Sequence, residues 1–203
     1  AGLFGGPKVY AATAESCFAY ITWPAEVAIT DYYGFEGGIL TNPACPRTVD
    51  IPSTLGGVPV KEISARAFEA KSLAGVTIPT TVGAIRSYAF AGNLLTAVDI
   101  PSSVQIIGSG AFINNQISAL DITSSTSNIG SGAFMGNRLA TAVYFAGVDY
   151  AGGSVFAHNL ITSVTIQPGV TRISSFTFKG NKITSVTFPS SVTSIGGDAF
   201  ADN

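Results

Sequence analysis

The chain has 203 residues, of which 46% are apolar and only 11% are charged, and its formal net charge is −2. The apolar content is sufficient for a buried core, whereas the low charge implies a neutral surface rich in hydroxyl groups and glycine. A balance of this kind excludes the basic patch of a nucleic-acid-binding protein, and no apolar run approaches the roughly 18 residues of a transmembrane helix. We therefore expect no nucleic-acid partner and no membrane insertion in this segment.

The N-terminal third of the chain is less regular than the rest. We expect residues 1–16, rich in Gly and Ala, to be a flexible leader, and residues 17–66 to form an N-terminal cap and an irregular first repeat. Within the cap, the segments 17–23 (CFAYITW) and 26–33 (EVAITDYY) are rich in β-branched and aromatic residues and are joined through Pro24. This pattern predicts a β-hairpin that covers the end of the core.

Both cysteines of the chain, Cys17 and Cys45, lie in this cap region. We predict that they form a disulfide, which would stabilise the fold by about 3 kcal/mol if the compartment is oxidising. The alternative is a pair of buried, unpaired thiols.

From Ala67 onward the sequence repeats every 22 residues, in six full units and a truncated seventh that together span residues 67–203. We number positions within a unit from the residue before its phenylalanine. The phenylalanine at position 2 predicts a ladder of stacked rings: Phe68, Phe90, Phe112, Phe134, Phe156, Phe178 and Phe200. A row of stacked asparagines is predicted at position 5: Asn93, Asn115, Asn137, Asn159, Asn181 and Asn203. One unit buries too little apolar surface to offset the entropy of ordering it, so the units must stack.

Positions 10 and 12 of each unit predict a short strand. They are apolar and mostly β-branched, as in Val98 and Ile100, which indicates a strand with one face inward. When units stack in register, equivalent positions lie roughly 4.8 Å apart and the strands pair in parallel. We expect positions 9, 11 and 13 to form the open surface of this sheet.

Pieces of the same pattern precede the regular repeats. Val49 and Ile51 match positions 10 and 12, and Ile63 lies one period before Ile85. Five extra residues lie between these two pieces, so we expect an irregular first turn.

The repeating stretches LLTAVDIPSSVQIIG and KITSVTFPSSVTSIG, each followed by an Ala-Phe pair, resemble the BspA-like, or Treponema pallidum-type, bacterial leucine-rich repeats. The resemblance spans roughly residues 45–203 and includes the irregular stretch CPRTVDIPSTLGGVPVKEI. It implies a mainly β, right-handed leucine-rich-repeat solenoid with parallel strands and an N-terminal β-hairpin cap. It also implies an extracellular or bacterial cell-surface location rather than a periplasmic one, and a role in adhesion and protein binding. Because the last unit stops after five residues, we expect further repeats or another domain downstream.

Catalytic chemistry is not predicted. The single histidine, His158, occupies position 4, and a turn with left-handed backbone is expected there. Other units have Gly92, Asn114, Gly136 or Gly180 at this position. No metal-ligand cluster, catalytic motif or cofactor motif accompanies the histidine. We expect no enzyme activity, no metal and no cofactor.

Two aspartates are candidate ligand-binding residues. Asp99 and Asp121 both occupy position 11 of consecutive units, so like charges should face each other, which is mildly destabilising. A cationic partner or calcium would relieve the repulsion. The alternative is that both carboxylates are simply solvated.

The unit from Ala133 contains the second candidate site. Val143 and Phe145 lie one residue later than positions 10 and 12, and Val148 returns to phase. A one-residue slip would turn Tyr144, and with it Tyr150, outward as aromatic anchors for a ligand. The alternative is a local repacking that keeps Tyr144 buried at position 12.

We therefore expect a non-enzymatic interaction module that binds a protein or glycan through its sheet face. The main alternative is a structural spacer in a larger surface protein. A third hypothesis, a hydroxyl array that matches ice or crystalline polysaccharide, is suggested by residues such as Thr162, Ser163 and Thr165, but Ala97 and Asp99 interrupt that array.

Overall fold

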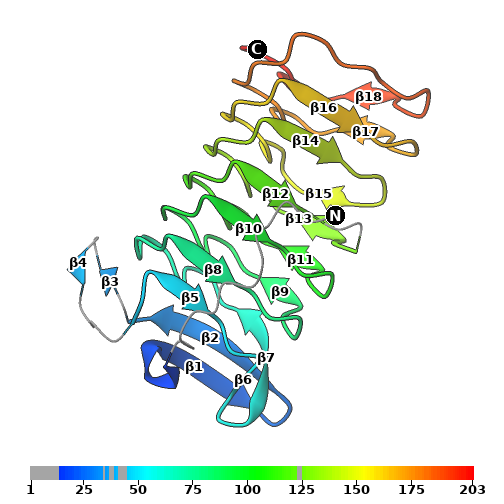
Figure 1. Cartoon of the computed structure of the whole chain (residues 1–203). Helices are drawn as coiled ribbons and strands as arrows, with labels where there is room; N and C mark the ends of the chain where they lie inside the picture. The colour runs from blue at the N-terminus through cyan, green and yellow to red at the C-terminus, as the bar shows by residue number, and fades with distance from the viewer. Residues whose placement is uncertain (1–13, 34, 37–38, 41–44, 123–124) are drawn as a thin grey trace, which may run out of the picture.

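Each 22-residue unit forms one rung of a solenoid, and the rungs stack into an elongated molecule that begins with a hairpin and ends in the truncated unit (Figure 1). The computed structural model describes residues 14–33, 35–36, 39–40, 45–122 and 125–203. Two rows of parallel strands run along the stack. We call them the first ladder and the second ladder.

The first ladder is built from positions 9 to 12 of the units. Its strands are β5 (Thr48–Asp50), β8 (Gly75–Thr77), β10 (Ala97–Asp99), β12 (Ala119–Asp121), β14 (Thr141–Tyr144) and β16 (Ser163–Ile166). They pair in parallel as β5 with β8, β10 with β12, and β14 with β16. Val98 and Ile100 are buried while Asp99 is exposed, which is the alternation that the sequence predicts for a strand with one inward face.

The second ladder lies on the neighbouring side of each rung. Its strands are β7 (Val58–Ile63), β9 (Ala84–Ile85), β11 (Ile106–Ile107), β13 (Asn128–Ile129), β15 (Asp149–Tyr150), β17 (Arg172–Ile173) and β18 (Ser194–Ile195). Pairing is continuous from β7 to β15, and β17 pairs with β18, but β15 does not pair with β17. This break positions the candidate site.

The N-terminal cap extends the second ladder, as the hairpin prediction requires. β1 (Phe18–Trp23) and β2 (Glu26–Tyr32) form an antiparallel pair, and β2 pairs in parallel with β7. The rings of Phe18 and Tyr32 lie 6.4 and 5.4 Å from the ring of Phe68. The hairpin therefore covers the end of the phenylalanine ladder.

The first turn of the solenoid is longer than the others. Val49 pairs with Val76 and Ile63 pairs with Ile85, so the separation between paired residues falls from 27 to 22. The five extra residues are accommodated by β6 (Thr54–Leu55), which forms a tight hairpin with the start of β7. A short antiparallel pair, β3 (Phe35–Glu36) and β4 (Ile39–Leu40), precedes this turn.

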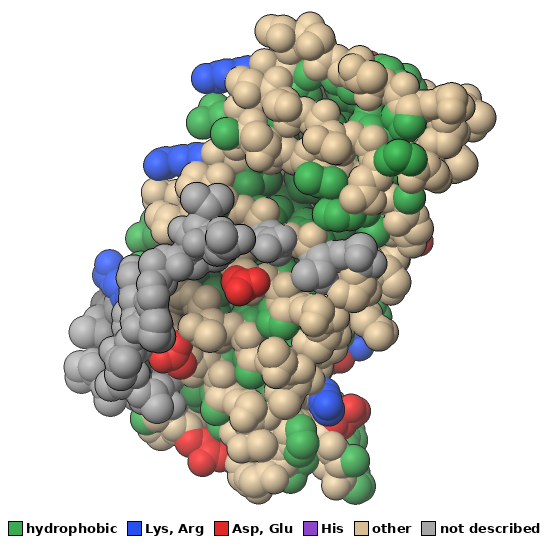
Figure 2. Space-filling model, turned by 45° about the vertical axis from the view of Figure 1, so that its right-hand side comes forward, with side chains coloured by type: hydrophobic (Ala, Val, Ile, Leu, Met, Phe, Trp, Pro, Cys, Tyr) green, Lys and Arg blue, Asp and Glu red, His purple; other side chains and the backbone are tan. Residues whose placement is uncertain are grey.

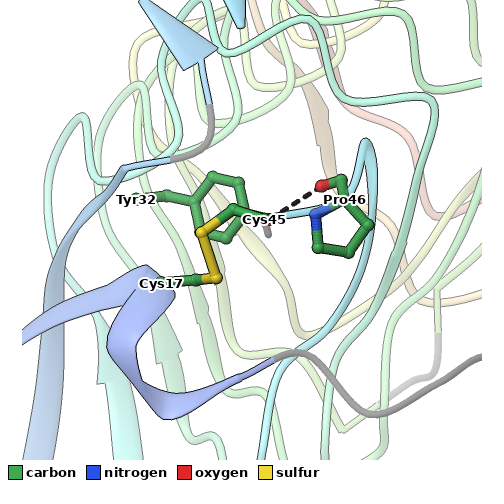
Figure 3. Close-up of a disulfide and its surroundings, with 4 residues drawn as sticks. All are labelled: Cys17, Tyr32, Cys45 and Pro46. Atoms are coloured by element: carbon green, nitrogen blue, oxygen red, sulfur yellow. Dashed lines mark hydrogen bonds between the residues drawn. A yellow bond between two sulfur atoms is a disulfide. The ribbon is translucent and has the colours of Figure 1, made fainter. Parts of the chain in front are cut away.

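The predicted disulfide joins Cys17 to Cys45, and both residues are buried (Figure 3). Beside it, the Tyr32 hydroxyl donates to the carbonyl oxygen of Pro46 at 2.7 Å. Residues 1–13 of the predicted leader lie outside the described residues. The 3-10 helix η1 (Glu15–Cys17) belongs to the cap, because the Glu15 carboxylate accepts hydrogen bonds from the Tyr20 hydroxyl and the Gly56 N–H.

Reducing this disulfide is expected to lower the free energy of unfolding by about 3 kcal/mol, because the bond closes a loop of 28 residues in the unfolded chain. Denaturant unfolding of the protein with and without reductant measures the effect. The variant C17S/C45S should unfold at the midpoint of the reduced protein and show no response to reductant. A variant as stable as the oxidised protein would contradict the prediction.

Two rows of identical side chains, one of phenylalanines and one of asparagines, fill the core. Ring centroids of consecutive phenylalanines lie between 4.9 and 6.0 Å apart from Phe68 to Phe200, with nearly parallel planes. Each asparagine connects its own rung to the preceding one. Asn137, for example, accepts from the Ile117 N–H at 3.0 Å and donates to the carbonyl oxygens of Phe112 and Phe134.

The turn at position 4 has left-handed backbone, as predicted for His158, whose φ is 54°. The exposed His158 ring lies over the next rung, where a Cβ on Gly180 would lie 2.6 Å from its Nδ1 atom. A side chain at position 180 would therefore have to displace the His158 ring.

Candidate functional site

The unit from Ala133 keeps its register in the first ladder. β14 pairs with β16 so that Tyr144 lies beside Ile166, one full period apart. Tyr144 is 2% exposed and Val143 is 37% exposed. The prediction that Tyr144 points outward is therefore wrong, because no slip occurs in this strand. The alternative prediction, with Tyr144 buried at position 12, describes the structure.

The slip occurs in the second ladder instead. Tyr150 pairs with Ile129, 21 residues earlier, whereas Ile129 pairs with Ile107, 22 residues earlier. The slip therefore follows Val148 rather than preceding it. Tyr150 takes the inward place of a ladder isoleucine and is only 6% exposed, so its predicted exposure is also wrong.

A glycine pair restores the period after the slip. Gly152 and Gly153 have φ values of 85° and 79°, which side chains rarely adopt. The Gly132 N–H donates to the Gly153 carbonyl at 3.0 Å, which returns the chain to the regular hydrogen-bonding pattern. Compared with a regular unit, this unit has one residue fewer before the inward position of Tyr150 and one residue more between Tyr150 and the following turn.

The two tyrosines form a structural unit rather than a binding surface. Their rings stack with centroids 3.8 Å apart. The Tyr150 hydroxyl accepts from the Phe145 N–H at 2.8 Å, and the Tyr144 hydroxyl accepts from the Ser174 N–H at 3.3 Å. Burial raises the pKa of both hydroxyls, so both remain neutral at physiological pH.

This packing interrupts the hydrogen bonds between β15 and β17. In the regular rungs, one N–H at the start of each second-ladder strand donates to the preceding rung at 2.9 Å, from Gln105, Ser127, Asp149 and Thr193. The equivalent N–H of Thr171 donates to no acceptor within the described part of the chain. The Ser174 hydroxyl instead connects the two rungs by donating to the Tyr150 carbonyl at 3.1 Å.

An apolar hollow of about 90 Å³ opens beside this unit between β12 and β14. It is lined by Leu120, Ile122, Thr141, Ala142, Val143, Phe145 and Phe156. Figure 2 shows hydrophobic side chains gathered in a hollowed part of the upper half of the molecule, at the height of β14 and β15 in Figure 1. Val143 and Phe145, which the sequence identified only as signs of a slip, supply its apolar rim.

A polar groove lies between β15 and β17. It comprises two adjoining cavities of about 180 and 360 Å³, and both are lined by Asp149, Tyr150, Arg172 and Ser174. We call it the rung groove. The side chains of Asp149 and Arg172 are exposed, and neither belongs to the ion pairs found among the described residues. Sequence reasoning missed both residues, although the Gly152–Gly153 pair marks the irregularity.

The predicted aspartate pair is adjacent in register. Asp99 lies beside Asp121 in the parallel pair of β10 and β12, and the Asp99 side chain is exposed. Only the backbone of Asp121 is described. Within the described residues, no group of three or more His, Cys, Asp or Glu side chains could hold a metal ion. No helix in that part of the chain is sufficiently long and apolar to cross a membrane.

Parallel 22-residue rungs, an apolar ring ladder and an asparagine ladder define a leucine-rich-repeat solenoid. The sequence matches the BspA type leucine rich repeat region (6 copies) over residues 61–175 and 151–203. The chain belongs to this family.

Two solved structures resemble the chain over nearly all of its length. The first is a leucine rich cell surface protein from Faecalibacterium prausnitzii A2-165, 26% identical, with a TM-score of 0.72 over 96% of this chain and 53% of that protein. The second is a T. pallidum leucine rich repeat protein, 21% identical, with a TM-score of 0.67 over 92% of this chain and 82% of that protein. The chain thus spans about half the length of the first relative. Among curated proteins, no match was found.

Proposed function

We propose that the chain is a non-enzymatic module of a bacterial cell-surface or secreted protein, and that it binds a protein or glycan beside the irregular unit. The apolar hollow between β12 and β14 carries this proposal. Val143 is 37% exposed at position 11, where Thr77 and Thr165 stand in other rungs. An exposed apolar side chain next to a concavity is the usual form of a binding anchor.

The surroundings of the hollow fit a macromolecular ligand better than a small one. The hollow holds only about 90 Å³, and the exposed side chain of Asp99 adds an acidic group to the same ladder face. An apolar anchor flanked by charge resembles the core and rim of a protein interface. An extracellular location is supported by the Cys17–Cys45 disulfide, which persists in oxidising compartments, and by the likeness to a cell surface protein.

A structural spacer is the second candidate function. The phenylalanine and asparagine ladders run through consecutive rungs from Phe68 to Asn203. Such continuous stacking gives a stiff rod, which would hold other domains away from the cell surface.

Replacing the apolar pair with the residues of the next rung tests the proposal. V143T/F145Q copies Thr165 and Gln167, so the strand chemistry is preserved while the hollow loses its apolar rim. We expect wild-type protein to bind members of an array of immobilised extracellular proteins and glycans, and the variant to bind them at least about tenfold more weakly.

The matched control is T165A/Q167A, which removes side chains from the same face outside the hollow. It should bind as the wild type does. Equal binding by V143T/F145Q would contradict a site at the hollow. No binding to the array by the wild-type protein would favour the spacer.

A further inference from the structure

The break between β15 and β17 leaves one backbone donor that the regular rungs satisfy. The Thr171 N–H has no acceptor in the described part of the chain, whereas the equivalent N–H groups of Gln105, Ser127, Asp149 and Thr193 each donate to the preceding rung. On its other side β15 keeps its backbone pairing with β13. Backbone groups left unpaired at a surface are available to a ligand or to water.

Two side chains of opposite charge lie in the groove near the Thr171 N–H. Asp149 and Arg172 are both exposed and line both cavities of the rung groove. The Asp149 carboxylate accepts one hydrogen bond, from the Asn128 amide at 3.3 Å, whereas the Arg172 guanidinium donates to no described residue. The groove therefore offers strong donors at Arg172 and a free carboxylate oxygen at Asp149.

Packed tyrosines form the back of the groove, and small residues form one of its edges. Tyr144 and Tyr150 stack behind it, and the Ala151–Gly153 segment borders the larger cavity. A side chain at Gly153 would collide with the Ser175 carbonyl, so the backbone there stays bare. The cavity of about 360 Å³ is within the size range of sites for small ligands.

The spacing of the rungs limits what can enter. The Ser174 hydroxyl spans the two rungs with a bond of 3.1 Å to the Tyr150 carbonyl, which leaves no room for a peptide strand between β15 and β17. A ligand must instead lie in the groove and direct small polar groups at its edges. It needs an anionic acceptor for Arg172 and the Thr171 N–H, and a hydroxyl donor for Asp149.

We propose that the rung groove binds one acidic saccharide unit, with its carboxylate on Arg172 and the Thr171 N–H and its ring hydroxyls on the Asp149 carboxylate. Guanidinium groups bind carboxylates through two parallel hydrogen bonds, and a carboxylate accepts readily from vicinal hydroxyls. The inference rests on the proposed function and names its glycan class, but it places the saccharide in the second ladder rather than in the apolar hollow.

The test is a titration of isotope-labelled full chain followed by amide NMR signals, with D-glucuronic acid and N-acetylneuraminic acid as probes. We expect saturable shifts at the Thr171 and Arg172 amides. D-glucose, which has a hydroxymethyl group in place of the carboxylate of D-glucuronic acid, should bind at least about tenfold more weakly, the loss expected for one charge-assisted pair. Acetate, a carboxylate without hydroxyls or an ammonium group, should also bind at least about tenfold more weakly.

Variants assign the contacts. R172Q should abolish the shifts caused by acidic sugars, and D149N should weaken them several-fold. R138Q, which removes an exposed arginine elsewhere on the solenoid, should leave them unchanged. Circular dichroism verifies that each variant is folded. The proposal is overturned if no acidic sugar shifts these amides, if glucose or acetate binds equally well, or if the shifts persist in R172Q.

The failure of this inference and the failure of the proposed function can be told apart. The single variant V143T should retain the acidic-sugar shifts, because Val143 lines the hollow and neither cavity of the rung groove, whereas Phe145 lines the hollow and the smaller cavity. Array binding that is lost in V143T/F145Q, together with an absence of acidic-sugar shifts, would overturn the saccharide site and leave the hollow as the binding surface.

Discussion

Replacing Phe134 with alanine is expected to lower the free energy of unfolding by about 3 to 5 kcal/mol, the usual cost of removing a fully buried aromatic ring. Phe134 is completely buried, and its ring lies between those of Phe112 and Phe156 at 5.5 and 6.0 Å. Neighbouring rungs cannot collapse into the cavity without breaking the hydrogen bonds that fix their spacing. Urea unfolding followed by far-ultraviolet circular dichroism measures the loss.

The position of Phe134 in the stack adds a second expectation. Each rung contacts only its neighbours, so a cavity in the middle weakens the coupling between the two ends of the solenoid. The unfolding transition of F134A should therefore broaden or divide in two, whereas that of the wild type should be single.

The terminal phenylalanine is the matched control. Phe200 is partly buried and stacks on one phenylalanine, Phe178, at 5.3 Å, and the ring of Phe188 contacts it edge-to-face at 5.7 Å. F200A should cost less than half as much as F134A, without broadening the transition. An equal loss in the two variants would indicate that ring stacking, rather than enclosure on both sides, dominates the stability of the ladder.

The regular part of the fold was predictable because every unit has the same residue types at the same buried positions. A phenylalanine at one fixed position must stack on its equivalents once the rungs are in register, and Asp99 must lie beside Asp121 by the same rule. The extra turn before Ile63 was predictable because its five additional residues could be counted between two recognisable pieces of the repeat.

The irregular unit was harder to predict because phase in the sequence is not the same as register in the structure. From the sequence, either Tyr144 or Tyr150 could be shifted from its position in the repeat. Only the backbone pairing shows which strand is one residue short. The Gly152–Gly153 pair was the available signal, since two consecutive glycines tolerate the backbone that an extra residue requires.

The hollow and the rung groove could not be predicted from periodicity. Val143 is exposed because its strand stays in phase, and the hollow beside it depends on the sizes of side chains from two different rungs. Asp149 and Arg172 become neighbours only because β15 and β17 fail to pair. Candidate binding residues therefore occur where one rung differs from its neighbours, while the repeated residues hold the stack together.

Replacing Asn137 with alanine is expected to lower the free energy of unfolding by about 2 kcal/mol. The substitution leaves the Ile117 N–H without a partner, and a buried, unsatisfied group costs about 1 to 3 kcal/mol. The carbonyls of Phe112 and Phe134 each keep a second donor, the amide of Asn115 or Asn159. Unlike F134A, this variant removes little apolar area. Its loss therefore reports on polar groups alone, again by urea unfolding.

The last asparagine supplies a control with the same hydrogen bonds in a different environment. Asn203 accepts from the Ile183 N–H at 3.0 Å and donates to the Phe178 carbonyl at 2.9 Å, but its side chain is exposed. N203A should cost about 1 kcal/mol or less, because water can satisfy the groups that it leaves. Equal costs in N137A and N203A would contradict burial as the cause.

An aspartate at position 137 separates the donor from the acceptor role of the asparagine. N137D keeps an acceptor for the Ile117 N–H but directs a buried carboxylate at the carbonyls of Phe112 and Phe134, so its pKa should rise in the folded state. A raised folded pKa contributes stability that is present below the unfolded value of about 3.9 and is lost as the pH rises. Compared with wild type at each pH, N137D should therefore recover stability toward pH 4, where the protonated acid can donate to a carbonyl. N137A should show no such recovery, since it has no proton to gain, and a pH-independent deficit in N137D would mean that the lost donor is not what destabilises the rung.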